Sequence, residues 1–168
     1  MTARRLALCA VLAALALALS YIEGMLPPPA PLPGFRLGLA NIVTLFALCA
    51  LGGADALAIL LTRVLLGAMF ASGATALLFS LLGGLAALGT MRVLSRVRAL
   101  SIYGVSVGGA AAHHVGQVCA AMLVLGSAAP LAYLPVLLAL SPLSGALTAF
   151  VCALLLRRAR GFLPPPGG

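Results

Sequence analysis

The sequence predicts an all-α membrane protein with six transmembrane helices and with both termini in the cytoplasm. The first observation behind this prediction is composition: 64% of the 168 residues are hydrophobic, only 7% are charged, and the mean hydropathy is +1.24. A soluble domain of this size has too little interior to bury so much apolar surface, so we expect a lipid bilayer around the chain. With roughly 25 to 28 residues for each helix and its loop, the length allows about six spans.

The second observation is the distribution of positive charge. The net charge is +8, from ten arginines, no lysine and only two acids, Glu23 and Asp55. Eight arginines fall in three short clusters that flank apolar runs: Arg4 and Arg5; Arg92, Arg96 and Arg98; Arg157, Arg158 and Arg160. Arginine collects in the cytoplasmic loops of membrane proteins. We therefore expect these segments on the cytoplasmic side of the cell's inner (plasma) membrane, and we expect no nucleic-acid partner.

The first apolar run predicts a helix over residues 5–22, although basic residues before an apolar core are also typical of a cleaved signal peptide. Ala10, Ala14 and Ala18 are four residues apart on this helix, and they form a smooth stripe suited to close contact with another helix. Residues 23–35 are rich in proline and cannot be the interior of a helix. They predict an extended loop, which is either a connector or a lid over a cavity.

The second and third helices are predicted over residues 36–51 and 54–70, with a glycine turn at 52–53. The third helix contains Arg63, which the predicted topology places roughly 13 Å deep in the membrane. A charge at that depth is costly and marks a functional site unless a structural partner accounts for it. The alternatives are that its side chain snorkels to the surface, or that it pairs with Asp55, whose own position suits the start of a helix.

The last three helices are predicted over residues 75–94, 99–125 and 131–156. Small residues recur every fourth position in the fifth helix and predict tight packing against a neighbour: Gly104, Gly108, Ala112 and Gly116. Pro135 and Pro142 should kink the sixth helix.

Serine and threonine hydroxyls near these prolines are expected to satisfy the backbone groups that a kink frees: Ser141, Ser144 and Thr148. We expect residues 1–160 to form one transmembrane domain and residues 161–168 to be a disordered tail.

Polar residues in the predicted outer half of the membrane are candidates for a ligand pocket with Arg63 at its floor. Ser106, His113 and Gln117 share one face of the fifth helix because their spacings are seven and four residues. The candidate substrate-binding residues are Arg36, Asn41, Arg63, Ser106, His113 and Gln117. Two guanidinium groups and apolar walls suggest a small ligand that is anionic or carries a carbonyl, with a ring or an isoprenoid body. The alternative for the histidines is internal hydrogen bonding between helices.

The sequence shows no motif for catalysis, a metal or a cofactor. No GxxxxGK[ST] nucleotide-binding sequence and no CxxCH haem-attachment sequence occur, and each of the four cysteines lies alone in an apolar run. Prenyl transfer needs clustered carboxylates to hold magnesium against diphosphate, whereas the two acids, Glu23 and Asp55, are 32 positions apart. We therefore expect a protein that is not an enzyme and that carries no cofactor.

Three stretches and a glycine turn resemble the Gx transporter family, which is also catalogued as heptaprenyl diphosphate synthase component I. They read GFRLGLANIVTLFAL from residue 34, Gly-Gly at 52–53, LLTRVLLGAMF from residue 60 and SVGGAAAHHVGQ from residue 106. The resemblance covers roughly residues 5 to 155. The family is grouped with the substrate-binding S components of energy-coupling factor transporters.

The resemblance implies a six-helix, S-component-like bundle with an outward-facing ligand pocket, and it places the loop between the first two helices in the lid. In S components an alanine stripe on the first helix docks a transmembrane coupling subunit that two cytoplasmic ATPases drive, and Ala10, Ala14 and Ala18 match that spacing. We expect a substrate-binding transport subunit. The alternative is a non-catalytic accessory component of heptaprenyl diphosphate or quinone metabolism.

Overall fold

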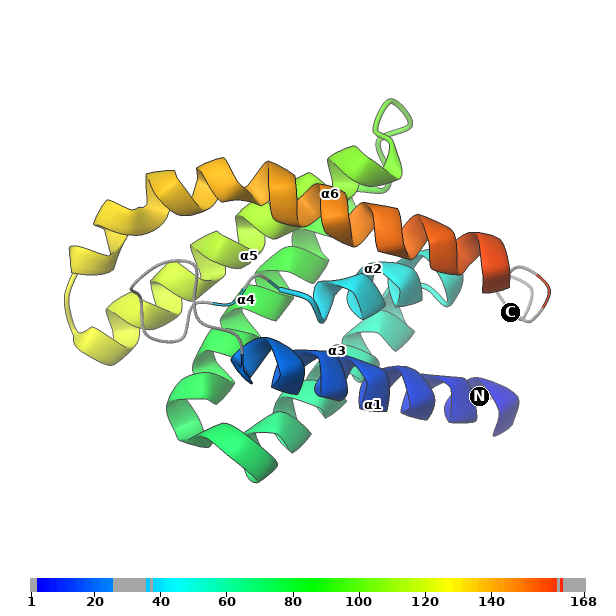
Figure 1. Cartoon of the computed structure of the whole chain (residues 1–168), viewed down its shortest axis with the longest axis horizontal. Coiled ribbons are helices and arrows are strands. Elements are labelled where there is room, and N and C mark those ends of the chain that lie inside the picture. The colour runs from blue at the N-terminus through cyan, green and yellow to red at the C-terminus, as the bar shows by residue number, and fades with distance from the viewer. Residues whose placement is uncertain (1–2, 26–35, 37, 160, 162–168) are drawn as a thin grey trace.

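The computed structural model describes residues 3–25, 36, 38–159 and 161, and this part of the chain contains helices and no strand. Six α-helices pack together around short turns (Figure 1). Their bounds are α1 Ala3–Met25, α2 Asn41–Ala50, α3 Gly53–Gly67, α4 Gly73–Leu94, α5 Ile102–Leu125 and α6 Leu134–Ala159. A π-helical turn, Ala68–Ser72, joins α3 to α4, and a 3-10 turn, Ala129–Tyr133, leads into α6. Residues 162–168 of the predicted tail (161–168) and residues 26–35 of the predicted loop (23–35) lie outside the described residues.

Five of the described helical segments are long and apolar enough to cross a membrane. This confirms an all-helical, multi-pass membrane protein. The exception is α2, which has 10 residues where the sequence predicted 16. At 1.5 Å per residue it is about 15 Å long, half of a bilayer's hydrocarbon core. The six predicted helices are present, but the second is too short to span the membrane alone.

The start of α2 differs from the sequence prediction because of the residues just before it. Gly38 has a backbone φ of +87°, which a right-handed helix cannot include and which favours glycine. The backbone N–H groups of Gly38 and Leu39 donate to the Glu23 side chain at the end of α1, at 2.6 and 3.0 Å. A helix can therefore begin only after this turn, at Asn41, and not at residue 36.

The short helix α2 lies at the centre of the bundle. Its residues 41–47 are all buried, and it contacts α1, α3, α4 and α6. The main hydrophobic core joins α2 to its neighbours through side chains such as Leu45, Ile59 and Met91, which are at most 2% exposed. A helix surrounded by others can be apolar on nearly every face, and α2 has only Asn41 and Thr44 as polar residues.

Glycines bring α4 and α5 into close contact. A Cβ on Gly116 would lie 2.5 Å from the backbone oxygen of Leu82 in α4, and one on Gly108 would meet Leu94. The predicted small-residue ridge on α5 is thus confirmed at these two positions. It is wrong at Gly104, where a Cβ would meet only Leu100, just before α5 on the same chain segment.

One end of the bundle carries an ion pair that the sequence did not predict. Arg5 donates to Asp55 at 2.6 Å and to the backbone oxygen of Leu51 at 3.0 Å, so it ties α1 to the turn between α2 and α3. The alternative that Arg63 pairs with Asp55 is wrong, because Arg5 occupies that carboxylate. The Arg92 side chain lies against Gly53 at the same turn. The start of α1 and the end of α6 lie at this same end of the molecule (Figure 1), in agreement with the predicted grouping of basic segments on one side.

Pro142 lies inside α6, which continues through it. The hydroxyl of Ser141 donates to the backbone oxygen of Leu137 at 3.0 Å, and that of Ser144 donates to Ser141 at 3.3 Å. Both serines therefore bond backbone carbonyls near the proline, but neither bonds the carbonyl of Leu138, four positions before Pro142, which is the acceptor that the missing N–H leaves free. The predicted role of these hydroxyls at a proline kink thus remains a prediction, and α6 continues through Pro142.

The tight contact between α4 and α5 gives a first prediction. Gly116→Ala should lower the stability of the protein in detergent micelles by about 1–3 kcal/mol, because backbone atoms of α4 cannot move aside for the new methyl group. The measurement is thermal unfolding followed by circular dichroism. Gly89→Ala is the matched control, since nothing lies within 4 Å of its added Cβ; equal loss in both variants would contradict the packing argument.

Candidate functional site

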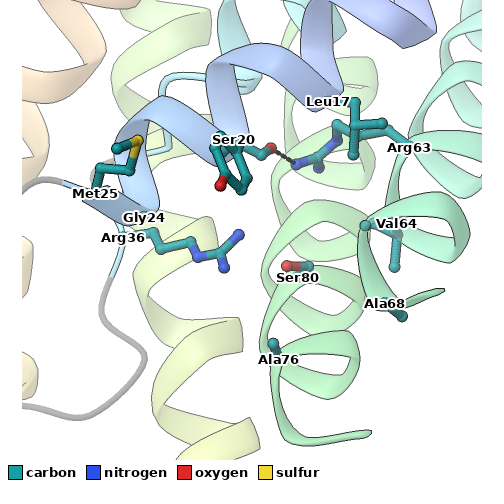
Figure 2. Close-up of a pocket in the computed structure, with 12 residues that line it drawn as sticks. Leu17, Ser20, Gly24, Met25, Arg36, Arg63, Val64, Ala68, Ala76 and Ser80 are labelled. Atoms are coloured by element: carbon teal, nitrogen blue, oxygen red, sulfur yellow. Dashed lines mark hydrogen bonds between the residues drawn. The ribbon is translucent and has the colours of Figure 1, made fainter. Parts of the chain in front are cut away.

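A cavity of about 240 Å³ lies between α1, α3 and α4. Figure 2 shows its lining side chains pointing inward from these helices and from the segment before α2. Its polar lining consists of two arginines and three hydroxyl-bearing side chains: Arg36, Arg63, Ser20, Tyr21 and Ser80. The remaining lining is apolar or glycine: Leu17, Gly24, Met25, Val64, Gly67, Ala68 and Ala76. No acidic residue lines it, so the cavity has a positive wall in otherwise apolar surroundings.

Arg63 projects from α3 into this cavity and is only 6% exposed. One of its terminal nitrogens donates to the hydroxyl of Ser20 in α1 at 2.8 Å (Figure 2). Its Nε atom has no hydrogen-bond partner, and no carboxylate of the described chain lies within 4 Å of the guanidinium. A buried cation with one neutral hydrogen bond is an expensive arrangement. The cavity is the place where a compensating anion can reach it.

Arg36 is the second cation of the cavity and comes from the segment before α2. It is half-buried, and its guanidinium extends toward Ser80 of α4 (Figure 2). Arginine presents donors in a planar fork that suits carboxylate and phosphate groups. Arg36 and Arg63 can therefore hold such a group from two sides, as the sequence analysis expected for this pair.

Glu23 fixes the backbone from which Arg36 projects. Its two carboxylate oxygens accept from the N–H groups of Gly38 and Leu39, so residue 36 lies two positions from the attachment point. The carboxylate is 6% exposed and does not line the cavity itself. Glu23 thus holds in place the chain segment that carries Arg36, without contacting the cavity itself.

The other four predicted site residues lie in the core beside the cavity and do not line it. Asn41, Ser106, His113 and Gln117 are each at most 5% exposed. Ser106, His113 and Gln117 share a buried face of α5, as predicted. Oδ1 of Asn41, Oγ of Ser106 and both ring nitrogens of His113 make no hydrogen bond of good geometry within the described residues.

Two adjacent glycines of α4 lie between these four buried polar residues and the cavity. A Cβ on Gly83 would lie 2.8 Å from the ring of His113, whereas one on Gly84 would lie 3.4 Å from a terminal nitrogen of Arg63. His113 and Arg63 therefore approach the same turn of α4 from two sides. The six predicted residues form two neighbouring groups and do not share one pocket.

Four residues at or behind the cavity were not among the predicted site residues: Ser20, Tyr21, Ser80 and Glu23. Ser20 and Glu23 are three positions apart near the end of an apolar helix, so they share a face, and polar residues on one face of a membrane helix were a usable signal. Ser80 gave no signal, because an isolated serine in a membrane helix bonds its own backbone in many proteins.

The alanine stripe of α1 lies on the surface of the bundle. Ala10, Ala14 and Ala18 are all exposed, whereas Ala13 and Ala16 point into the core. The stripe is therefore accessible to another helix or to lipid. Within the described residues, no group of three or more histidine, cysteine or acidic side chains could hold a metal ion.

The fold and the cavity together define a class: an integral membrane protein of α-helices with a small, positively charged cavity among them. The sequence model of one family, described as heptaprenyl diphosphate synthase component I, matches residues 12–155, and the chain belongs to this family. This confirms the family that the motifs indicated. No curated protein and no solved structure matches the chain.

The turn that carries Arg36 gives a second prediction. Gly38→Ala should lower stability by about 1–2 kcal/mol, because a positive φ is strained for alanine and the new Cβ would lie 2.7 Å from the Asn41 side chain. Thermal unfolding without ligand measures this effect. Gly24→Ala borders the same cavity, meets nothing within 4 Å and should be neutral. A stable Gly38→Ala protein would show that the turn does not depend on glycine.

Proposed function

We propose that this chain is a substrate-binding subunit of a transporter in the plasma membrane, and that it holds a small anionic, partly apolar molecule between α1, α3 and α4. The observation that supports this most is Arg63: its guanidinium is buried, faces a cavity and has no carboxylate partner in the described chain. Membrane-embedded charges of this kind mark ligand or ion sites by default.

The cavity's size and lining support a small amphiphilic ligand. At about 240 Å³ it is below the range of about 300–1,000 Å³ that drug-sized ligands occupy. Leu17, Val64 and Ala76 supply apolar wall beside the two arginines. A molecule with one anionic end and a short apolar body satisfies both parts, and a chain of seven isoprene units would have to extend beyond the cavity.

In this proposal the energy for uptake comes from partner chains. The sequence contains no GxxxxGK[ST] site. The exposed stripe of Ala10, Ala14 and Ala18 is the surface we assign to a transmembrane coupling subunit, which cytoplasmic ATPases would drive. Small residues allow the close helix contact that such docking needs.

A second candidate function comes from the family description: a non-catalytic membrane component that accompanies a prenyl diphosphate synthase. We propose no catalytic role for the chain itself. Asp55 is paired with Arg5 near the start of α1, while Glu23 binds backbone near its end. The 18 positions between Arg5 and Glu23 correspond to about 27 Å of helix, so the two acids do not form a magnesium site.

The anion site gives a third prediction, to be checked by thermal unfolding with a panel of carboxylates, phosphate and pyrophosphate. At one hundred times its Kd, a bound anion should stabilise the protein by about 2.7 kcal/mol. Arg63→Gln should abolish this gain. Arg96→Gln, which removes an exposed charge in the loop after α4, should keep it. Equal loss in both variants, or no stabilising anion, would refute the site.

The choice between the two candidate functions gives a fourth prediction. Purification from native membranes in a mild detergent should recover a coupling subunit and ATPases with the wild-type chain. Ala14→Trp should lose them, because a large side chain prevents close docking, while Leu143→Trp on the exposed face of α6 should retain them. Recovery of a soluble prenyl synthase in their place would support the accessory function and contradict transport.

A further inference from the structure

Glu23 is the one carboxylate that can influence the charge of the cavity. The whole chain has only two acids, and the other, Asp55, is neutralised by Arg5 near the far end of α1. Glu23 immediately precedes Gly24, which lines the cavity. Any ligand held by Arg36 and Arg63 therefore shares its surroundings with one fixed negative group.

The hydrogen bonds of Glu23 favour its ionised form. One carboxylate oxygen accepts the N–H of Gly38 at 2.6 Å, and the other accepts the N–H of Leu39 at 3.0 Å. An ionised carboxylate only accepts hydrogen bonds, and N–H donors aimed at its oxygens stabilise the charged form relative to the neutral acid. One N–H donor on each oxygen of Glu23 therefore stabilises its negative charge.

The charges around the cavity then sum to one positive unit. Arg63 and Glu23 are each 6% exposed and of opposite sign, while Arg36 is half-buried at the edge. Water screens Arg36 in part, so the net potential inside is modest. In a medium of low permittivity, each unit of charge left uncompensated is costly. A ligand with one negative charge balances this site, and a ligand with two or three overcompensates it.

We propose, on the basis of the anion site inferred above, that Glu23 makes the cavity selective for a monoanion: a carboxylate on a short apolar body, in preference to a diphosphate. A carboxylate offers the two coplanar oxygens that a guanidinium fork binds. The hydroxyl of Ser20, which accepts from Arg63, keeps its own hydrogen free to donate to the ligand. The ligand of the cavity is then distinct from the diphosphate that the family description names.

The test compares hexanoate and pyrophosphate as probes at equal ionic strength, with the full-length protein in detergent. For the wild type we expect a Kd for hexanoate at least about tenfold below that for pyrophosphate, as one uncompensated charge at close range implies. Glu23→Gln adds one positive unit and should shift this ratio toward pyrophosphate by about tenfold or more. Asp55→Asn removes the other acid and should leave the ratio unchanged.

The outcomes separate this inference from the function on which it rests. If neither probe binds the wild type, the anion site itself is wrong. If pyrophosphate binds the wild type more tightly, the anion site stands and the preference for a monoanion is overturned. If Glu23→Gln binds hexanoate and pyrophosphate in the wild-type ratio, Glu23 does not set the charge. Should Glu23→Gln fail to fold, the wild-type ratio alone decides between a monoanion and a diphosphate.

Discussion

The positive charge of Arg63, held inside an apolar bundle, is the constraint to which the neighbouring structure is adapted. Its guanidinium has one neutral partner, Ser20 of α1, and lies beside Gly84 of α4. Arg63 lines a cavity and is only 6% exposed, and no carboxylate of the described residues pairs with it. A buried cation without a carboxylate partner is costly, and an anion bound in the cavity would lower that cost.

The two acids hold the two ends of α1 in different ways. Near its start, Arg5 bridges Asp55 and the backbone oxygen of Leu51, where the negative end of the α2 dipole favours a cation. Near its end, Glu23 accepts hydrogen bonds from the backbone N–H groups of Gly38 and Leu39, which lie before the first turn of α2. Since α1 forms one wall of the cavity, these contacts fix the position of that wall relative to α3 and to Arg36.

Much of the helical layout could be predicted from the sequence, because apolar runs, glycine turns and arginine clusters are local signals. The tight packing at Gly116 also followed from its spacing. The start of α2 did not, because it depends on Glu23, a contact made across 15 positions of the chain. The prediction of a single pocket failed for a related reason. Sequence spacing puts His113 and Gln117 on one face of α5, but only the packing of α4 between them separates this face from Arg63.

The half-length helix α2 also affects how the chain can enter a membrane. Ten residues gain too little from contact with lipid to partition as an independent segment, since a spanning helix takes about 20. The following helix α3 carries the buried charge of Arg63, but with the turn after it, Gly53–Phe70 is long and apolar enough to cross a membrane. The Gly52–Gly53 turn joins α2 and α3 into a helical hairpin. We therefore expect α2 to stay inside the membrane only when it is packed against α3 and its other neighbours, α1, α4 and α6. The shortness of α2 therefore makes its insertion into the membrane depend on that of α3.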